Sequence, residues 1–172
     1  MKKILYLGVF LGITASVATA ALAGVNQITA PIIQSALEAA FREAVAVAFP
    51  TAGHFEVLPD DSGNPYIVEI LEVFEQGETI GFVFTKRVNG FSGAIDFMVG
   101  VDTEGRFTSF TTLSHSETPG FGDVIETEEW SAQIVGYQVG RHIDIVSGVT
   151  VTTEPIIRAL ATLYYEFAEG GD

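Results

Sequence analysis

Hydroxyl-bearing side chains gather in one short stretch of this chain, DIVSGVTVTTEP, which runs from Asp144 to Pro155. Serine and threonine hydroxyls can donate hydrogen bonds to a phosphate, and Gly148 lets the backbone approach a ligand closely. The stretch precedes a predicted helix, whose first N–H groups attract an anion. It is therefore a candidate phosphate-binding turn. A helix that begins without any ligand uses the same residue types as its cap, so both interpretations stay open at this point.

The spacing of this stretch, Asp144-x-x-Ser147-Gly148-Val149-Thr150, resembles the flavinylation motif of FMN-binding domains. Such domains occur in the G subunit of the Rnf ion-translocating oxidoreductase and in the C subunit of the sodium-pumping NADH:quinone reductase. The family usually has alanine where Val149 stands in this chain. The resemblance implies that Thr150 carries FMN through a phosphoester bond, and that Asp144, Ser147, Gly148 and Val149 complete the cofactor-binding turn. A dedicated, magnesium-dependent flavin transferase would supply the FMN from FAD.

A second block, HSETPGFG from His115 to Gly122, is similar to the His-x-Glu-Thr-Pro-Gly-Leu-Gly loop of the same family, with Phe121 in place of the usual leucine. The resemblance implies that Glu117, Thr118 and Phe121 line the flavin. His115 has carboxylates near it in sequence, but their spacing matches no recognised metal motif, so no metal site is expected. No catalytic residue is assigned, because no nucleophile motif such as Gly-x-Ser-x-Gly is present.

An apolar segment without charges, from Ile4 to Val25, precedes both motifs and is long enough as a helix to span a bilayer. A cleaved secretory signal peptide is the alternative, since small-x-small sequences lie near its end. The length of the segment favours an uncleaved anchor. Lys2 and Lys3 would hold the N-terminus in the cytoplasm. We therefore predict a membrane anchor, residues 1–25, and one periplasmic or extracellular domain, residues 26–172.

Composition restricts the chemistry further. The 172 residues suit one domain and an anchor. The formal net charge of −14 repels phosphate backbones, so nucleic acid is not an expected partner. The absence of cysteine excludes a thiolate nucleophile and a cysteine-ligated iron–sulfur cluster. Redox chemistry would therefore require an organic cofactor or haem.

Apolar residues at three- and four-residue spacing, from Leu37 to Ala48, predict a helix over Ala36–Ala48 that ends before Pro50. Turn residues then separate β-rich runs, and Asp102-Thr103-Glu104-Gly105 indicates a hairpin turn. These runs predict an antiparallel meander of four strands: Tyr66–Phe74, Thr79–Val88, Gly93–Val101 and Arg106–Leu113. A further strand is predicted over Ser131–Gly140.

The last predicted element is a helix capped by Thr152 or Thr153. Its apolar face would comprise Ile156, Leu160, Leu163, Tyr164 and Phe167. The predicted fold class is therefore α+β: an N-terminal transmembrane helix, then one extracytoplasmic FMN-binding domain with a mostly antiparallel sheet flanked by helices.

The resemblance also implies a function. The chain would be the electron-transfer component of a membrane-bound ferredoxin:NAD oxidoreductase that translocates sodium or protons, with other integral membrane subunits as partners. It would carry electrons within that complex and not act as a stand-alone enzyme. Two alternatives stay open. One is a cofactor-free, membrane-anchored binding module, and the other is a flavin carrier for a different extracytoplasmic reductase.

Overall fold

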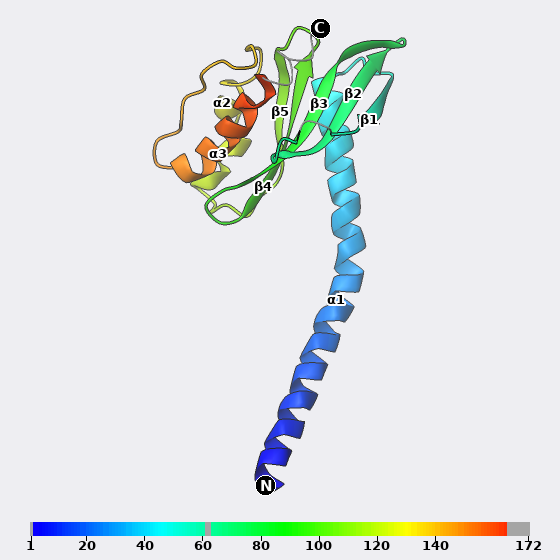
Figure 1. Cartoon of the computed structure of the whole chain (residues 1–172), viewed down its shortest axis with the longest axis vertical. Coiled ribbons are helices and arrows are strands. Elements are labelled where there is room, and N and C mark those ends of the chain that lie inside the picture. Colours follow the sequence, from blue (N-terminus) through cyan, green and yellow to red (C-terminus); the bar gives the residue numbers. More distant parts are fainter. Residues whose placement is uncertain (1, 61–62, 165–172) are drawn as a thin grey trace. The chain divides into compact units, whose positions relative to one another are not determined.

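The computed structural model describes residues 2–60 and 63–164 (Figure 1). The chain divides into two compact units, the first ending at Ala40 and the second beginning at Phe41. The helices and strands are α1 (Lys2–Ala48), β1 (His54–Leu58), β2 (Ile67–Glu75), β3 (Glu78–Asn89), β4 (Ala94–Asp102), β5 (Phe107–Ser114), the 3₁₀ turn η1 (Gly122–Glu126), α2 (Glu128–Ser131) and α3 (Thr150–Ala161).

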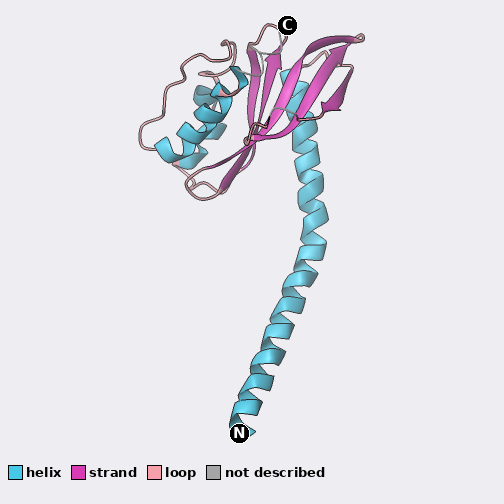
Figure 2. Ribbon diagram, in the orientation of Figure 1, coloured by secondary structure: helices cyan, strands magenta, loops and turns pink. Residues whose placement is uncertain are grey.

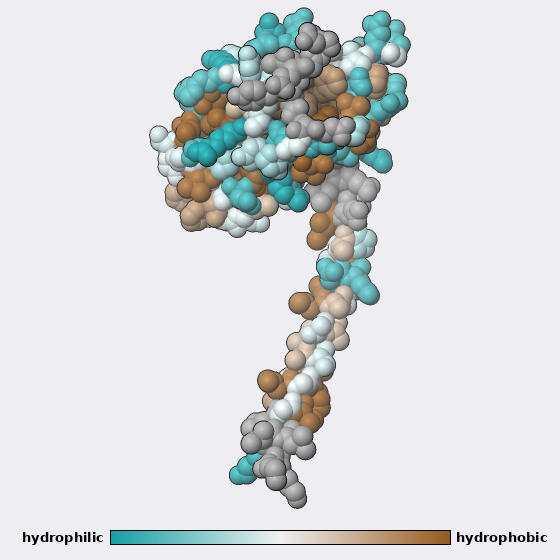
Figure 3. Space-filling view, in the orientation of Figure 1, coloured by the Kyte–Doolittle hydropathy of each residue, from teal (hydrophilic) through white to brown (hydrophobic). Residues whose placement is uncertain are grey.

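The first unit consists of the N-terminal part of α1. Within it, Gly8–Ile33 is long and apolar enough to cross a membrane, with a mean hydropathy of 1.8 over 26 residues. A signal sequence near the N-terminus has the same features. Exposed apolar side chains line this segment (Figure 3). The apolar stretch therefore extends eight residues beyond Val25, the end predicted from sequence, and the boundary between residues 25 and 26 stays a prediction.

The sheet of the second unit is an antiparallel meander in the order β1-β2-β3-β4-β5 (Figure 2). The four strands predicted from sequence are confirmed as β2 to β5, and the hairpin turn after β4 is confirmed too. Asp102 closes that turn, because its backbone oxygen accepts from Gly105 N at 3.0 Å and its Oδ1 accepts from Arg106 N at 2.8 Å. β1 was not predicted.

Both faces of the sheet are covered, so β4 is buried on both sides. On one face, Leu71, Val73 and Met98 pack against the end of α1, which contributes Ala44 and Ala48. The predicted helix over Ala36–Ala48 is thus confirmed as the last part of α1, while the side chains of Leu37 and Ala40 lie outside the described residues.

On the other face, α3 packs against the sheet. Ile95, Phe97 and Val99 alternate along β4 and point into a core that includes Ile156 and Leu160 of α3. Each such fully buried side chain stabilises the fold by about 1.5–3 kcal/mol. Tyr164, by contrast, is 53% exposed, so its predicted place on the buried face is wrong, and Phe167 lies outside the described residues.

The predicted strand over Ser131–Gly140 is wrong. The helix α2 ends at the first residue of this segment, Ser131, and turns follow, with one isolated bridge between Arg106 and Gln138. Gly136 and Gly140 have φ of +84° and +87°, which no extended strand adopts. The segment instead covers the outer edge of β5, because Phe107 N donates to Tyr137 O.

Candidate functional site

The first turn of α3 forms one wall of the site. Gly148 has a φ of +89°, a backbone conformation that favours glycine, and Val149 follows as the N-cap. The carbonyl of Val149 accepts hydrogen bonds of 3.0 Å from the N–H groups of Thr152 and Thr153. Thr150 is therefore the first helical residue, with an exposed side chain, at the end of the helix where unpaired N–H groups lie.

The predicted N-cap at Thr152 or Thr153 is therefore wrong, because the N-cap is Val149, three to four residues earlier. Gly148, in the left-handed region, ends the preceding turn. Val149 has a φ of −130°, outside that region, and the helix begins at the next residue, Thr150. Thr152 and Thr153 instead lie inside the first turn, where they are 3% and 0% exposed.

A second wall comes from the loop between β5 and η1. Gly120, with a φ of +80°, reverses the chain, and the carbonyl of Thr118 accepts from the N–H groups of Phe121 and Gly122 at 3.1 and 3.0 Å. His115 supports the start of the loop, since its Nδ1 accepts from Glu117 N at 3.0 Å. The other ring nitrogen of His115 lies 3.0 Å from Glu126 Oε1. These bonds give His115 a structural role in the loop.

Glu117 connects this loop to the rest of the site. Its side chain is 6% exposed, and its Oε2 accepts a 2.6 Å hydrogen bond from Thr152 Oγ1. Its Oε1 accepts a 2.9 Å hydrogen bond from Ser92 N, in the turn between β3 and β4. A buried carboxylate needs such donors, because an unpaired buried charge costs several kcal/mol.

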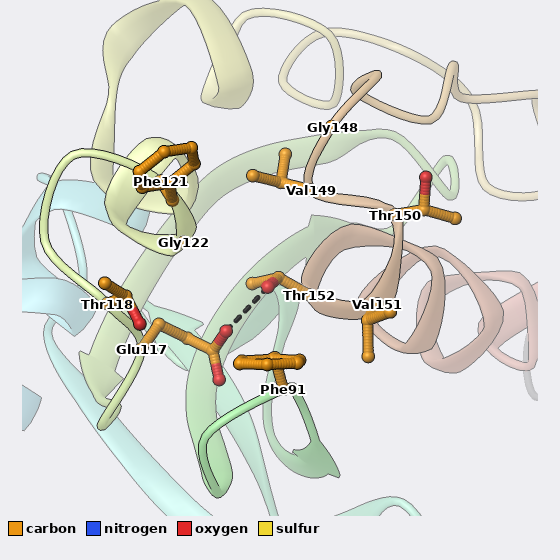
Figure 4. A pocket seen from close by; sticks show the side chains of 10 residues that line it. All are labelled: Phe91, Glu117, Thr118, Phe121, Gly122, Gly148, Val149, Thr150, Val151 and Thr152. Carbon is orange, nitrogen blue, oxygen red and sulfur yellow. Dashed lines mark hydrogen bonds between the residues drawn. The ribbon is translucent and has the colours of Figure 1, made fainter.

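The first turn of α3, the loop between β5 and η1, and the turn between β3 and β4 surround a cavity of about 530 Å³ (Figure 4). Of the residues predicted to bind the cofactor, six line the cavity: Glu117, Thr118, Phe121, Gly148, Val149 and Thr150. Asp144 and Ser147 are not among the lining residues. Asp144 has an 89% exposed side chain, with its carboxylate 3.6 Å from His142 Nε2. The cavity thus collects the two sequence motifs in one place.

Phe91 lines the cavity as well and was missed from sequence. It lies in the turn between β3 and β4, and Figure 4 shows its ring across the cavity from Phe121. The two rings are 73% and 67% exposed. The only sequence signal was an aromatic residue inside a glycine-containing turn, NGFSG.

The chemistry of the lining fits FMN. The rings of Phe91 and Phe121 and the side chains of Val149 and Val151 offer apolar contact to a planar ring system, and threonine hydroxyls lie beside them. The volume lies within the usual range for ligand pockets, about 300–1,000 Å³. None of the described lining residues is cationic, so helix N–H groups and hydroxyls are the donors available to a phosphate.

Comparison with known proteins agrees with this site. Residues 90–164, which contain every described lining residue of the cavity, match the FMN-binding domain family. The fold and the site thus define an FMN-binding domain.

Relatives narrow the assignment. The chain is 31% identical to the G subunit of the ion-translocating oxidoreductase complex of Methanosarcina acetivorans, over 75% of this chain and 77% of the relative. It is 28% identical to the G subunit of the Na⁺-translocating ferredoxin:NAD⁺ oxidoreductase complex of Acetobacterium woodii, over 92% and 82%. This chain belongs to the family of G subunits of ion-translocating oxidoreductase complexes. A crystal structure of Shewanella oneidensis NqrC aligns over 66% of each chain, with 20% identity and a TM-score of 0.49, and adds nothing to this assignment.

Proposed function

We propose that this chain is the electron-transfer G subunit of a membrane-bound, ion-translocating ferredoxin:NAD oxidoreductase and carries FMN covalently on Thr150. The observation that carries the proposal is the position of Thr150. Its exposed hydroxyl begins α3 at the edge of the cavity, within the Asp144-x-x-Ser147-Gly148-Val149-Thr150 spacing. The names of both relatives describe G subunits of ion-translocating oxidoreductase complexes, and the second name specifies a ferredoxin:NAD⁺ oxidoreductase.

Attachment requires a partner enzyme. A threonine hydroxyl is a weak nucleophile unless a base activates it. Among the described residues, none that could act as this base forms a hydrogen bond with the Thr150 hydroxyl. We infer that a magnesium-dependent flavin transferase supplies base and metal. Thr150 Oγ then bonds to the FMN phosphorus of FAD, the pyrophosphate bond breaks, AMP leaves, and the hydroxyl proton passes to the transferase. The exposure of Thr150 leaves its hydroxyl accessible for this reaction.

The residues of this chain then hold and shield the cofactor. FMN, when bound, supplies the one- and two-electron redox chemistry. Phe91 and Phe121 would exclude water from the ring system, and the N-terminus of α3 would stabilise the phosphodiester charge. The covalent bond would keep the flavin on an exported domain from which a free cofactor could be lost.

Membrane attachment completes the proposal. The segment Gly8–Ile33 would cross the membrane once, with Lys2 and Lys3 on the cytoplasmic side. The domain would then lie in the periplasm or outside the cell and exchange electrons with other integral membrane subunits of the complex.

Purification from native membranes tests the proposal. The denatured chain should show flavin fluorescence on a gel, because a covalent flavin survives unfolding. Several integral membrane proteins of the complex should also co-purify with it under mild detergent. A colourless denatured chain, from cells with an active flavin transferase, would favour a cofactor-free binding module. A fluorescent chain without those partners would favour a carrier for another reductase.

A further inference from the structure

The position of the Phe91 ring depends on the backbone of its turn. The side chain is 73% exposed, so little packing fixes its ring. Its turn is closed by one backbone hydrogen bond of 2.8 Å, from Gly90 N to Gly93 O. Whatever holds the residues next to Phe91 therefore decides where its ring lies relative to the cavity.

Glu117 contacts the residues on both sides of Phe91. Its Oε1 accepts from Ser92 N at 2.9 Å. On the other side, Gly90 lies so close to the carboxylate that a Cβ there would come within 2.6 Å of Oε1. The turn therefore rests directly on the Glu117 carboxylate, and the absence of a side chain at Gly90 makes this contact possible.

The same carboxylate holds the first turn of α3 through Thr152, at 2.6 Å. Thr152 is two residues after Thr150, so Glu117 connects the aromatic turn to the helix start that bears the proposed attachment site. Gly122 lies against the Glu117 side chain from a third side, because a Cβ at Gly122 would lie 2.8 Å from Glu117 Oε2. Figure 4 shows Glu117 between Phe91, Thr118 and Thr152.

We propose that Phe91 is a flavin-contacting residue and that Glu117 is its positioning residue, which holds the 90–93 turn against the first turn of α3. This inference rests on the proposed function, since it takes FMN to be the occupant of the cavity. Glu117 acts through hydrogen bonds and takes no part in electron transfer.

The position of the hydrogen-bond donors gives the carboxylate this role. An ionised carboxylate only accepts hydrogen bonds, and here each oxygen accepts from a different element. Bonds to a charged acceptor are roughly twice as strong as neutral ones. A glutamine side chain could keep both connections, because its oxygen can accept from Ser92 N while its NH₂ group donates to the Thr152 hydroxyl.

The first experiment measures the turn without any flavin. Full-length chain from cells that lack a flavin transferase is compared by amide hydrogen exchange with its Glu117→Ala and Glu117→Gln variants. Glu117→Ala should speed exchange at Ser92 at least several-fold, while Glu117→Gln should keep most of the protection. Glu104→Ala, which removes an exposed carboxylate from the turn after β4, is the matched control. Unchanged exchange at Ser92 in Glu117→Ala would overturn the positioning role.

The second experiment uses the flavin-loaded chain and measures quenching of flavin fluorescence by iodide. Phe91→Ala should raise the quenching constant several-fold, because one wall of the cavity is lost. Glu117→Ala should raise it similarly although Phe91 is still present, and Glu117→Gln should stay near the native value. An unchanged quenching constant in Phe91→Ala would show that Phe91 does not contact the flavin. A change in Phe91→Ala without one in Glu117→Ala would overturn the positioning role.

If Glu117→Ala fails to fold, Thr152→Val takes its place, since it removes one of the two connections and keeps the shape of the side chain. It should raise both the exchange at Ser92 and the quenching constant, by less than Glu117→Ala would. The experiments distinguish failure of the proposed function from failure of the positioning role of Glu117. A chain that never acquires flavin contradicts the proposed function, whereas loss of the positioning role is read from the flavin-free exchange experiment.

Discussion

The hydroxyl of Thr152 donates a 2.6 Å hydrogen bond to Oε2 of Glu117, and the two residues are 35 positions apart in sequence. Both side chains are buried, with exposures of 3% and 6%. The bond joins the His115–Gly122 loop to the helix that begins at Thr150. The two motifs that resemble one flavoprotein family in sequence therefore form one site in space.

Loss of the Thr152 hydroxyl should destabilise the domain. In Thr152→Val the buried Glu117 carboxylate loses one donor, and leaving a buried group unsatisfied costs about 1–3 kcal/mol. Thermal and denaturant unfolding of the full chain can be followed by the emission of Trp130, the single tryptophan, which is 1% exposed. Both variants are compared as flavin-free chains from cells that lack a flavin transferase, because Thr150 is the proposed attachment site. Thr150→Val, at an exposed position, is the matched control and should change the free energy of unfolding by less than about 0.5 kcal/mol.

Gly148→Ala should destabilise the turn before α3. Alanine at a φ of +89° is strained by about 1–2 kcal/mol, even though the space around Gly148 is open. Flavin loading, measured by the absorbance of purified protein, should fall with it, because the strain acts next to Val149 and Thr150. Gly53→Ala is the control, since it lies outside the cavity lining and its Cβ would make only an ordinary 3.5 Å contact with the carbonyl oxygen of Phe74. Equal loading and stability in the two variants would contradict the role of the left-handed turn.

Lys86 and Arg87 are neighbours on β3 with opposite environments. Lys86 is 0% exposed, and its Nζ donates to Ala159 O at 2.9 Å and to Thr162 Oγ1 at 3.0 Å. Hydrogen bonds from a charged donor contribute about 1.5–3 kcal/mol, so Lys86→Met should lower the free energy of unfolding by about that much. Arg87→Met should lower it by less than about 1 kcal/mol, because its pair with Asp96 is exposed.

The Arg87–Asp96 pair should also be insensitive to pH near neutrality. The hydrogen bond and the charge of Asp96 raise the pKa of Arg87 above its ordinary value. A cation whose pKa is raised in the folded state contributes its full stability below the unfolded pKa and loses it only as pH rises through the folded pKa. The difference in unfolding free energy between the native chain and Arg87→Met should therefore stay constant from about pH 6 to about pH 9, because arginine stays charged throughout this range. A slope in that range would contradict this assignment.

Phe121→Ala should change the flavin without preventing its attachment. The ring is 67% exposed and lines the cavity, so its removal should shift the visible absorbance or the reduction potential of bound FMN, while the mass of the modified chain stays that of the FMN adduct. Phe55→Ala, which removes another exposed phenylalanine on β1, is the control. Unchanged spectrum and potential in Phe121→Ala would count against contact between this ring and the flavin.

Sequence patterns predicted the sheet well where apolar and polar residues alternate clearly along the chain. Strands β2 to β5 lie within one residue of their predicted bounds at either end, since each has apolar side chains at alternate positions and turn residues at its ends. β1 was not predicted because its five residues are mostly exposed and lie at the sheet edge. The segment Ser131–Gly140 was wrongly predicted as a strand because its valines and isoleucine favour strands, while its glycines impose turns.

The candidate site was predictable only in part. The two motifs identified the residues from Glu117 to Phe121 and from Gly148 to Thr150 that line the cavity. The hydrogen bonds from Ser92 and Thr152 to Glu117 depend on how β3, β4 and α3 pack, which local sequence does not encode. Phe91 belongs to the same category, because only the sheet register brings its turn to the cavity.

The mass of the chain purified from its own membranes tests the central claim most directly. Intact mass and peptide mapping should show an adduct of FMN minus one water on the peptide that contains Thr150, and Thr150→Ala should abolish it. The native chain and the variant should be expressed at similar levels, because the Thr150 side chain is exposed. An unmodified Thr150 in cells with an active flavin transferase, or an adduct that persists in Thr150→Ala, would contradict the account.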